Sequence, residues 1–554
     1  MADFYHMSRV SEHAEKAISW LLFGALLSIL ALSMGCGSSN KTNSPTTIYV
    51  TPRGQSVVEG ASLTISAAVN GANGFDGLAW KLSGPGQLSQ PEQNSIIYTA
   101  PPSVVGNTDV VVTATTNSGS SGYAALTVLP FSVTPNVQPV LVNGGPTNKI
   151  YPNGGFTSVT VCTPGTTKCN TIQGILVDTG SVGLRILSSA LPPLPNVTDA
   201  KGTPISECFQ FVDQSYVWGQ VAVGDVKIAG EVAGQISIHS IADPTGFSVP
   251  SDCSNSGSGT DISSQQALGA NGILGIGLEP QDCGFACDPS SSGKPPGSAY
   301  YACSGSCSPT FVPLQQQVDN PTTFFATDNN GLILQFPALA GVSTTLTGSI
   351  IFGIGTQTGG TALGSPAANG LGSAVVFTVD ANDNFTTQLS NTGQQLTSSF
   401  INSGSSGFFF PDGIPTCSSS AFSFFCPDSL MQLTATNVGT NGAQSTIVFS
   451  VDNADNLFAQ NPAAAAFSTL AGQNSKGTCA SGSGACSFEW GMPFFYGRSV
   501  YVAINGQLVP PGAPPAPWWA YAPGSPAPVI PAGAAIYQPF RLTQTLTDTS
   551  ANPQ

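Results

Sequence analysis

The chain has 554 residues, which exceeds one ordinary domain and predicts two to four. Only 8% of its residues are charged, against roughly a quarter in typical soluble domains. The formal net charge of −15 leaves no basic footprint, which argues against a nucleic-acid partner. The three histidines are His6, His13 and His239. A histidine-rich metal site is therefore excluded, and any catalytic Ser-His or Cys-His pair would have to use His239.

The N-terminus predicts an export signal. Residues 17–32 are apolar and uncharged, and they follow Arg9 and Lys16. This run is shorter than the roughly 20 residues of a membrane span. Small residues then precede Cys36, as in a bacterial lipobox, although Ser33 stands where that motif usually has Leu.

We therefore expect a lipoprotein signal peptide at 1–35, lipidation of Cys36 and a flexible tether at 36–45. An uncleaved anchor and a plain secretory signal are the alternatives. The lipid would attach the chain to a bacterial membrane, so the expected location is the cell envelope, either periplasmic or at the cell surface. No metal or cofactor is expected, and the chain is expected to be a monomer.

The cysteine count fits an exported chain, because removing Cys36 from 13 cysteines leaves an even 12. Short spacings predict local disulfides, and a more distant pair is also feasible. A four-cysteine cluster has no pairing that the sequence can assign, and a four-thiolate zinc site is its alternative. The local pairs are Cys162/Cys169, Cys417/Cys426 and Cys479/Cys486, the distant pair is Cys208/Cys253, and the cluster is Cys283, Cys287, Cys303 and Cys307.

Residues 46–130 contain short alternating runs separated by Gly, Asn and Pro about every ten residues, which predicts a β-sandwich. Trp80 is the expected core anchor, and residues 97–102 resemble a strand end of bacterial immunoglobulin-like repeats. The region holds no cysteine and no titratable cluster. We interpret it as an immunoglobulin-like spacer, with carbohydrate or protein binding as the alternative.

From residue 131 the chain is again strand-rich, so the predicted fold class is mainly β. A short helix is expected at 311–318. Residues 509–531 are rich in Pro, Ala and Gly and include Trp518 and Trp519, which predicts an extended loop laid over a surface.

Five segments of this region carry a resemblance. Residues 175–181 form an apolar strand that ends in Asp178, Thr179, Gly180 and Ser181, which resembles the active-site loop of pepsin-like aspartic proteases. Residues 271–277 resemble the apolar strand that threads past that loop. The second loop is matched by 399–405, the closing segment by 490–498, and the first strand of the second lobe by 348–353.

The order and spacing of these segments imply two lobes, at 131–335 and 336–554, the second ending in the Pro-rich C-terminal loop. Residues 156–162, 176–187 and 491–495 together are similar to an exported bacterial family of unknown function that is itself thought to be aspartic-protease-like. This resemblance indicates a fold more than an activity.

The resemblance assigns catalytic positions to Asp178 and Asn402. Two carboxylates in such a site share one proton and one water, which drives their pKa values apart. An amide neither ionises nor shares a proton, so the coupled pair is absent at Asn402. The residues expected to orient the two side chains are Thr179, Gly180 and Ser181 in the first loop and Ser403, Gly404 and Ser405 in the second.

No substitute acid can be assigned from the sequence. Asp412 follows Asn402 by ten residues and is expected at the far end of its strand. Asp380, Asp383 and Glu489 are too distant along the chain to place. A structural turn acid is the alternative interpretation of Asp178.

The resemblance also implies a hairpin flap over the cleft. Residues 211–219, followed by a strand at 225–230, occupy the place of the flap in chain order. Tyr216 is the expected flap aromatic, with Trp218 as its competitor.

Three functions follow. The first is a degenerate protease-like cleft that binds an extended peptide or glycan with little or no proteolysis. The second is an active acid peptidase of the aspartic type, using Asp178. The third is a structural or adhesive envelope protein without enzymatic activity.

Overall fold

The computed structural model describes residues 47–522, apart from 52–53, 61, 71–76, 90–93, 102–103, 105–107, 130–135, 148, 167, 243–246, 298, 360–366, 419–422 and 475–485. The predicted signal peptide, Cys36, the tether, Cys479 and the chain beyond 522 lie outside these residues. The described residues are mainly β, as the sequence predicts.

Residues 47–129 form two four-stranded sheets around one apolar core. Alternate residues of the long strands are buried, including Val110, Val112 and Ala114. Trp80 is only half-buried and packs at the margin of this core, whereas Tyr98 is fully buried and donates to Pro85 O. In sheet order the strands are β1 (Thr47–Thr51), β3 (Ser62–Asn70), β6 (Ser95–Thr99) and β5 (Gln87–Leu88), then β2 (Gly54–Val58), β8 (Ser121–Leu129), β7 (Thr108–Thr116) and β4 (Leu78–Ser83).

A 16-stranded sheet dominates residues 136–522. Its first part comprises β19 (Ser306–Pro309), β18 (Tyr300–Ser304), β13 (Ile205–Gln210), β14 (Ser215–Ile228), β15 (Glu231–Ile241), β12 (Val182–Leu187), β17 (Gly272–Ile276), β11 (Cys169–Asp178) and β10 (Gly155–Cys162), with β16 (Thr260–Asp261) beside β14. It continues through β9 (Val137–Val142), β22 (Leu346–Phe352), β20 (Gly331–Gln335), β32 (Ser499–Ala503), β33 (Trp518–Tyr521) and β23 (Val375–Thr378).

A seven-stranded sheet contains the second predicted loop, and the remaining elements are short. Its strands are, in order, β28 (Gln444–Val451), β27 (Met431–Val438), β24 (Phe385–Leu389), β25 (Gln395–Ile401), β31 (Glu489–Trp490), β26 (Phe408–Phe410) and β30 (Ala471–Gln473). The others are β21 (Val342–Ser343) with β29 (Ala466–Phe467), the helices α1 (Gln265–Leu268) and α2 (Ala454–Gln460), and the 3-10 turns η1 (Ser188–Ala190), η2 (Asn255–Gly257), η3 (Gly284–Cys287), η4 (Leu314–Gln316), η5 (Pro321–Phe324) and η6 (Met492–Phe495).

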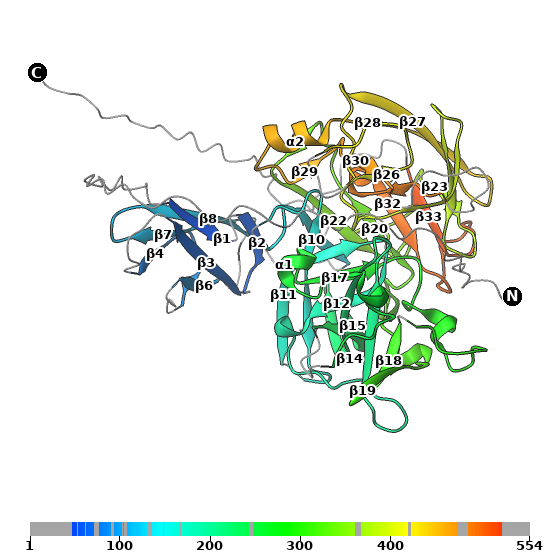
Figure 1. The fold of residues 1–554 in the computed structure, drawn as a ribbon, viewed down its shortest axis with the longest axis horizontal. Helices are drawn as coiled ribbons and strands as arrows, with labels where there is room; N and C mark the ends of the chain where they lie inside the picture. The colour runs from blue at the N-terminus through cyan, green and yellow to red at the C-terminus, as the bar shows by residue number, and fades with distance from the viewer. Residues whose placement is uncertain are drawn as a thin grey trace, which may run out of the picture. The chain divides into compact units, whose positions relative to one another are not determined.

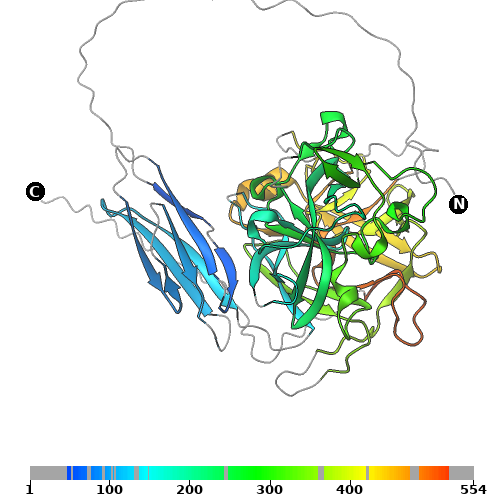
Figure 2. The same ribbon diagram turned by 90° about the horizontal axis from the view of Figure 1, so that it is seen from below.

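The two halves of residues 136–522 share a sheet and a core. Strand β9 pairs with β10 on one side and with β22 on the other. Figure 1 labels β10 and β22 near the middle of this part of the chain. Figure 2 shows the same ribbon turned by 90° about the horizontal axis. The largest apolar cluster runs from Val140 to Tyr521 and includes residues of both halves. Strand β20, at the end of the predicted first lobe, lies between β22 and β32.

Two local expectations were wrong. The helix expected at 311–318 is only the 3-10 turn η4, because Gln317 is extended and its side chain bonds to the carbonyls of Gly284 and Val312. Trp518 and Trp519 lie in the buried strand β33 rather than in a surface loop. Burying both large rings in the core outweighs the loop-forming composition around them.

Disulfides link segments that are close together along the chain. The local pairs expected at Cys162/Cys169 and Cys417/Cys426 are present, and so is the distant pair. The four-cysteine cluster forms two disulfides instead of a zinc site. Cys486 is disulfide-bonded, while its expected partner Cys479 lies outside the described residues. The described disulfides are Cys162–Cys169, Cys208–Cys253, Cys283–Cys287, Cys303–Cys307 and Cys417–Cys426, a set typical of exported proteins.

No helix within the described part of the chain is long and apolar enough to cross a membrane.

Asn153 ties the two halves together from a buried position. Its Nδ2 donates to Ser406 O at 2.6 Å and Phe467 O at 2.9 Å. Its Oδ1 accepts from Phe467 N at 2.6 Å and from the Tyr496 hydroxyl at 2.7 Å. The backbone of Asn153 has φ 57°, a left-handed conformation that asparagine tolerates better than most residues.

We predict that Asn153→Ala lowers the free energy of unfolding by about 3 kcal/mol or more, because several buried polar groups lose their partner. Asn153→Gly removes the same bonds without the left-handed strain, so it separates the two costs. Urea unfolding followed by tryptophan fluorescence measures both. Asn391→Ala is the control, since Asn391 makes an exposed bond to Asp412. Equal midpoints for wild type and Asn153→Ala would contradict the assignment.

Candidate functional site

The two predicted loops have the same strand arrangement. In the first half, β17 runs parallel to β11, which ends at Asp178, and antiparallel to β12. In the second half, β31 runs parallel to β25, which ends just before Asn402, and antiparallel to β26. Each loop therefore leaves a strand, turns, and returns on the far side of a third strand that threads between.

Reciprocal hydrogen bonds lock the loops to each other. Thr179 N donates to Ser403 Oγ at 3.0 Å, and Ser403 N donates to Thr179 Oγ1 at 3.0 Å. The Thr179 hydroxyl donates to Ile401 O at 3.0 Å, and the Ser403 hydroxyl donates to Val177 O at 2.8 Å. Both hydroxyls are buried, so these bonds fix the separation of the loops.

Asp178 and Asn402 make matching contacts within their own loops. Asp178 Oδ1 accepts from Gly180 N at 2.9 Å, and Oδ2 accepts from the Ser181 hydroxyl at 2.5 Å. Asn402 Oδ1 accepts from Gly404 N at 2.8 Å, and its Nδ2 donates to Ser405 Oγ at 3.1 Å. The amide thus occupies the position in its loop that the carboxylate occupies in the other.

The two side chains face each other across the loop glycines. A Cβ placed on Gly404 would lie 2.5 Å from Asp178 Oδ1 and 3.2 Å from Asn402 Oδ1. A Cβ on Gly180 would lie 2.4 Å from Asn402 Cγ. Only glycine fits at either position, because any side chain would collide with the opposite loop. Asp178 is buried, while Asn402 is half-buried and Gly180 is exposed, so solvent reaches the site from one side.

Glu489 is the acid that the sequence could not place. Its Oε1 accepts from Asn402 Nδ2 at 2.6 Å and from the Ser405 hydroxyl. Glu489 lies opposite Phe400 in the β25–β31 pairing, and the corresponding residue of the first half, opposite Leu176, is the buried Ile273. The second half therefore has a carboxylate beside its amide where the first half has an apolar side chain.

Burial controls the protonation of both acids. It raises the pKa of Asp178, against the hydrogen bonds from Ser181 and Gly180 and the charge of Arg185. Burial also raises the pKa of Glu489, against the bonds from Ser405 and Asn402, and the negative charges of Asp178 and Asp213 raise it further. Protons are therefore held more tightly at this site than on ordinary carboxyl groups.

A third carboxylate and a tyrosine complete the surroundings. Tyr151 donates from its hydroxyl to Gly404 O at 3.2 Å. Burial raises its pKa, and the charges of Asp178, Asp213 and Glu489 add to this effect. Asp213 lies in the turn between β13 and β14, so this hairpin contributes a charge that acts on Tyr151 and Glu489.

Tyr216 and Trp218 do not face the site. They pack with the Cys208–Cys253 disulfide and Tyr301 in a separate apolar cluster. The other face of the hairpin carries Phe209, Phe211 and Val217, which pack in the cluster that includes Tyr151. Alternation along the strands sends adjacent residues to opposite faces, so the two aromatic groups cannot share one environment.

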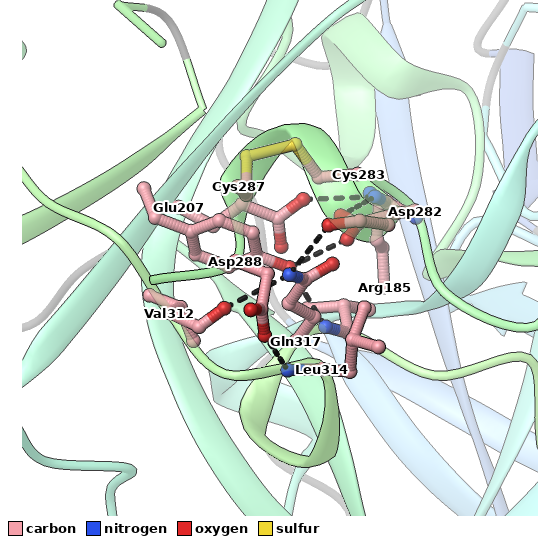
Figure 3. Close-up of a disulfide and its surroundings, with 12 residues drawn as sticks. Arg185, Glu207, Asp282, Cys283, Cys287, Asp288, Val312, Leu314 and Gln317 are labelled. Atoms are coloured by element: carbon pink, nitrogen blue, oxygen red, sulfur yellow. Dashed lines mark hydrogen bonds and ion pairs between the residues drawn. A yellow bond between two sulfur atoms is a disulfide. The ribbon is translucent and has the colours of Figure 1, made fainter. Parts of the chain in front are cut away.

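A buried ion cluster joins the hairpin to the first loop (Figure 3). Arg185, which is fully buried in β12, places Nη2 2.8 Å from Glu207 Oε1 and 2.8 Å from Asp282 Oδ2. Glu207 belongs to β13, and Asp282 precedes the Cys283–Cys287 disulfide. His239 Nδ1 lies 3.1 Å from Glu207 Oε2, but burial and Arg185 lower the His239 pKa, so this imidazole stays neutral.

The other acids considered from the sequence lie elsewhere. Asp412 accepts from Asn391 at 3.0 Å, and Asp380 accepts from backbone amides of its own turn. Burial raises the pKa of Asp383 to about 7, with Glu279 and Asp380 adding to it. Among the described residues, Cys417, Cys426 and Asp455 group with metal-ligand spacing, but the two cysteines are joined in a disulfide.

The matching loops lie within residues 132–521, and this stretch matches a family described as "Protein of unknown function (DUF3443)". The chain belongs to this family. No curated protein matches the chain. The family match thus covers both loops, the hairpin and Glu489.

The raised pKa values predict that stability falls as pH rises. Burial raises the pKa of Asp319 to about 7, and those of Asp178 and Glu489 also rise. Between about pH 4 and 7 the native state therefore holds protons that the unfolded chain releases, so the free energy of unfolding decreases across that window. His239 acts in the opposite sense, since its lowered pKa costs stability as pH falls below about 6.5.

Asp319→Asn should reduce this loss by up to about 1.4 kcal/mol per pH unit, because the amide cannot titrate. Urea unfolding at a series of pH values between about 4 and 8 gives the slope. Asp199→Asn is the control, since backbone hydrogen bonds lower the Asp199 pKa and its contribution has the opposite sign. An unchanged slope in Asp319→Asn would contradict the assignment.

Proposed function

We propose that residues 46–130 are an immunoglobulin-like spacer and that residues 131–554 form a two-lobed, pepsin-like domain. We further propose that its Asp178–Asn402 cleft binds an extended peptide or glycan and hydrolyses it poorly or not at all. The matching loops, their threading strands and the reciprocal Thr179–Ser403 bonds support the arrangement.

The observation that carries the function is the amide at Asn402. It makes the loop contacts of a catalytic acid, yet it has no proton to share with Asp178. Asp178 can still activate a water. Without a second acid at the contact position, no group protonates the carbonyl or the leaving amine, and losing such a group typically costs about 10²–10⁴-fold in rate.

The charges around the cleft indicate the ligand class. The charges of Asp178 and Asp213 both act on Glu489, whereas the nearby cation Arg185 is paired with Glu207 and Asp282. An anionic ligand would meet an excess of carboxyl groups over cations. A neutral glycan or a neutral-to-basic peptide is therefore favoured, with the β13–β14 hairpin as its cover.

Glu489 favours a second candidate, an active acid peptidase. Its carboxyl group lies directly behind the Asn402 amide and could supply the missing proton through a rearranged side chain. In this alternative, Asp178 activates the water and Glu489 is the second acid.

Membrane attachment belongs to the same proposal. A lipid on Cys36 would anchor the chain, and the spacer would hold the cleft away from the membrane. A purely structural or adhesive role is the remaining alternative. Such a role would not require the matching loops at Asp178 and Asn402.

Cleavage of a fluorescently labelled unfolded protein between about pH 3 and 6 separates these candidates. We expect wild type and Asp178→Ala to be equally slow, and Asn402→Asp to gain activity by restoring the shared proton. The identity of residue 402 is read by mass spectrometry in every sample. Robust wild-type cleavage that Asp178→Ala abolishes would overturn the binding proposal. If Glu489→Gln also abolished this cleavage, the acid-peptidase candidate would be favoured.

Binding is measured separately on peptide and glycan arrays at neutral pH. Wild type should retain a reproducible set of neutral or basic ligands that Asp178→Ala weakens. Asp199→Asn, which alters a surface turn apart from the site, is the matched control. Arrays without selective ligands would leave the structural role as the remaining explanation.

A further inference from the structure

We propose that Asn402 is a self-modification site, at which the protein hydrolyses the side-chain amide to an aspartate and releases ammonia. Polar groups contact the nitrogen and the oxygen of this amide, and the residue is only half-buried.

The nitrogen of Asn402 contacts a carboxyl group, to which it donates in the resting state. Nδ2 lies 2.6 Å from Glu489 Oε1 and 3.1 Å from Ser405 Oγ, and Ser405 also bonds to Glu489. Other buried asparagines differ, since Asn153 and Asn320 direct their Nδ2 at backbone carbonyls. Burial raises the Glu489 pKa, so this acid stays protonated at a higher pH than an exposed glutamate.

The carbonyl of Asn402 is held for attack. Gly404 N donates to Oδ1 at 2.8 Å, which is the position of an oxyanion in an addition intermediate. The Asp178 carboxylate faces this carbonyl from across the loop glycines. Asn402 is half-buried and the adjoining Gly180 is exposed, so a water molecule can reach the amide carbon.

The step balances with water as the only co-reactant. Ionised Asp178 takes a proton from the water, whose oxygen bonds to Asn402 Cγ. The Cγ–Nδ2 bond then breaks as Glu489 gives its proton to the nitrogen. The products are a carboxyl group at residue 402 and ammonia, with a proton gained by Asp178 and lost by Glu489.

The usual succinimide route is obstructed here. That route requires the backbone nitrogen of the next residue to attack the amide carbon. Ser403 N is instead bonded to Thr179 Oγ1 at 3.0 Å in the reciprocal lock, and Ser403 is fully buried. Direct hydrolysis should therefore yield aspartate without isoaspartate.

The consequence for catalysis rests on the proposed function. Conversion would place a second carboxylate opposite Asp178 and turn a binding cleft into one with two acids that share a proton. The asparagine form would then be a latent state. The modification itself is independent of peptide cleavage, so each can fail without the other.

The test follows the peptide containing residue 402 by mass spectrometry while the purified full-length chain is incubated for several weeks in 18O-labelled water. We expect Asn402 to become aspartate with one 18O atom and no isoaspartate. Asn505 is the internal reference. Its Nδ2 lies 3.0 Å and 3.1 Å from the Glu279 oxygens at an exposed position followed by glycine, which favours the succinimide route.

Asp178→Asn and Glu489→Gln should each slow conversion by about 100-fold or more, because each removes a positioned acid or base. Circular dichroism checks that the variants fold, and the wild-type result stands if one of them does not. Unfolding in urea should also abolish the selectivity for residue 402. Asn402 that stays intact while Asn505 reacts would overturn the proposal, as would an aspartate–isoaspartate mixture formed equally fast in both variants.

Discussion

Two hydroxyl groups hold the centre of this protein together. Thr179 and Ser403 each accept from the other's backbone amide and each donate to a carbonyl of the opposite half. These hydrogen bonds fix the distance between the loops, and therefore the positions of Asp178 and Asn402 relative to each other. The glycines on either side leave no room for a Cβ, so the two loops can approach this closely only with glycine at both positions. The threading strands and the shared core supply the framework on which these few bonds act.

The site contains one neutral side chain, the Asn402 amide, with carboxyl groups next to it. Asn402 has the contacts of an acid without its charge, while Glu489 lies one layer behind it. Glu489 occupies the position that Ile273 has in the first half. The Asn402 amide therefore lies between two acids, Asp178 and Glu489. Arg185 is paired with Glu207 and Asp282, so its charge offsets only part of the effect of burial on Asp178.

Local patterns in the sequence predicted the mainly β fold and the two loops, because each loop is a contiguous motif. Glu489 was missed since only the parallel pairing of β25 with β31 brings it to Asn402. Aligning the threading segments of the two halves would have revealed it, because Glu489 then falls opposite Ile273. Tyr151 and Asp213 belong to turns whose positions depend on tertiary packing. Tyr216 and Trp218 were chosen by residue type, although strand alternation decides which face meets the site.

The described disulfides close short stretches of chain, with separations of 4 to 45 residues. The central sheet, in contrast, pairs Val137 with Ile351 and Gly331 with Ala503. Pairings between such distant residues form slowly, because the entropy of closing a long loop is lost before the contacts form. The disulfides therefore constrain local segments, whereas the long-range pairings of the sheet bring the two loops together. The two loops meet only where these long-range pairings have formed, so any chemistry they perform together requires the folded chain.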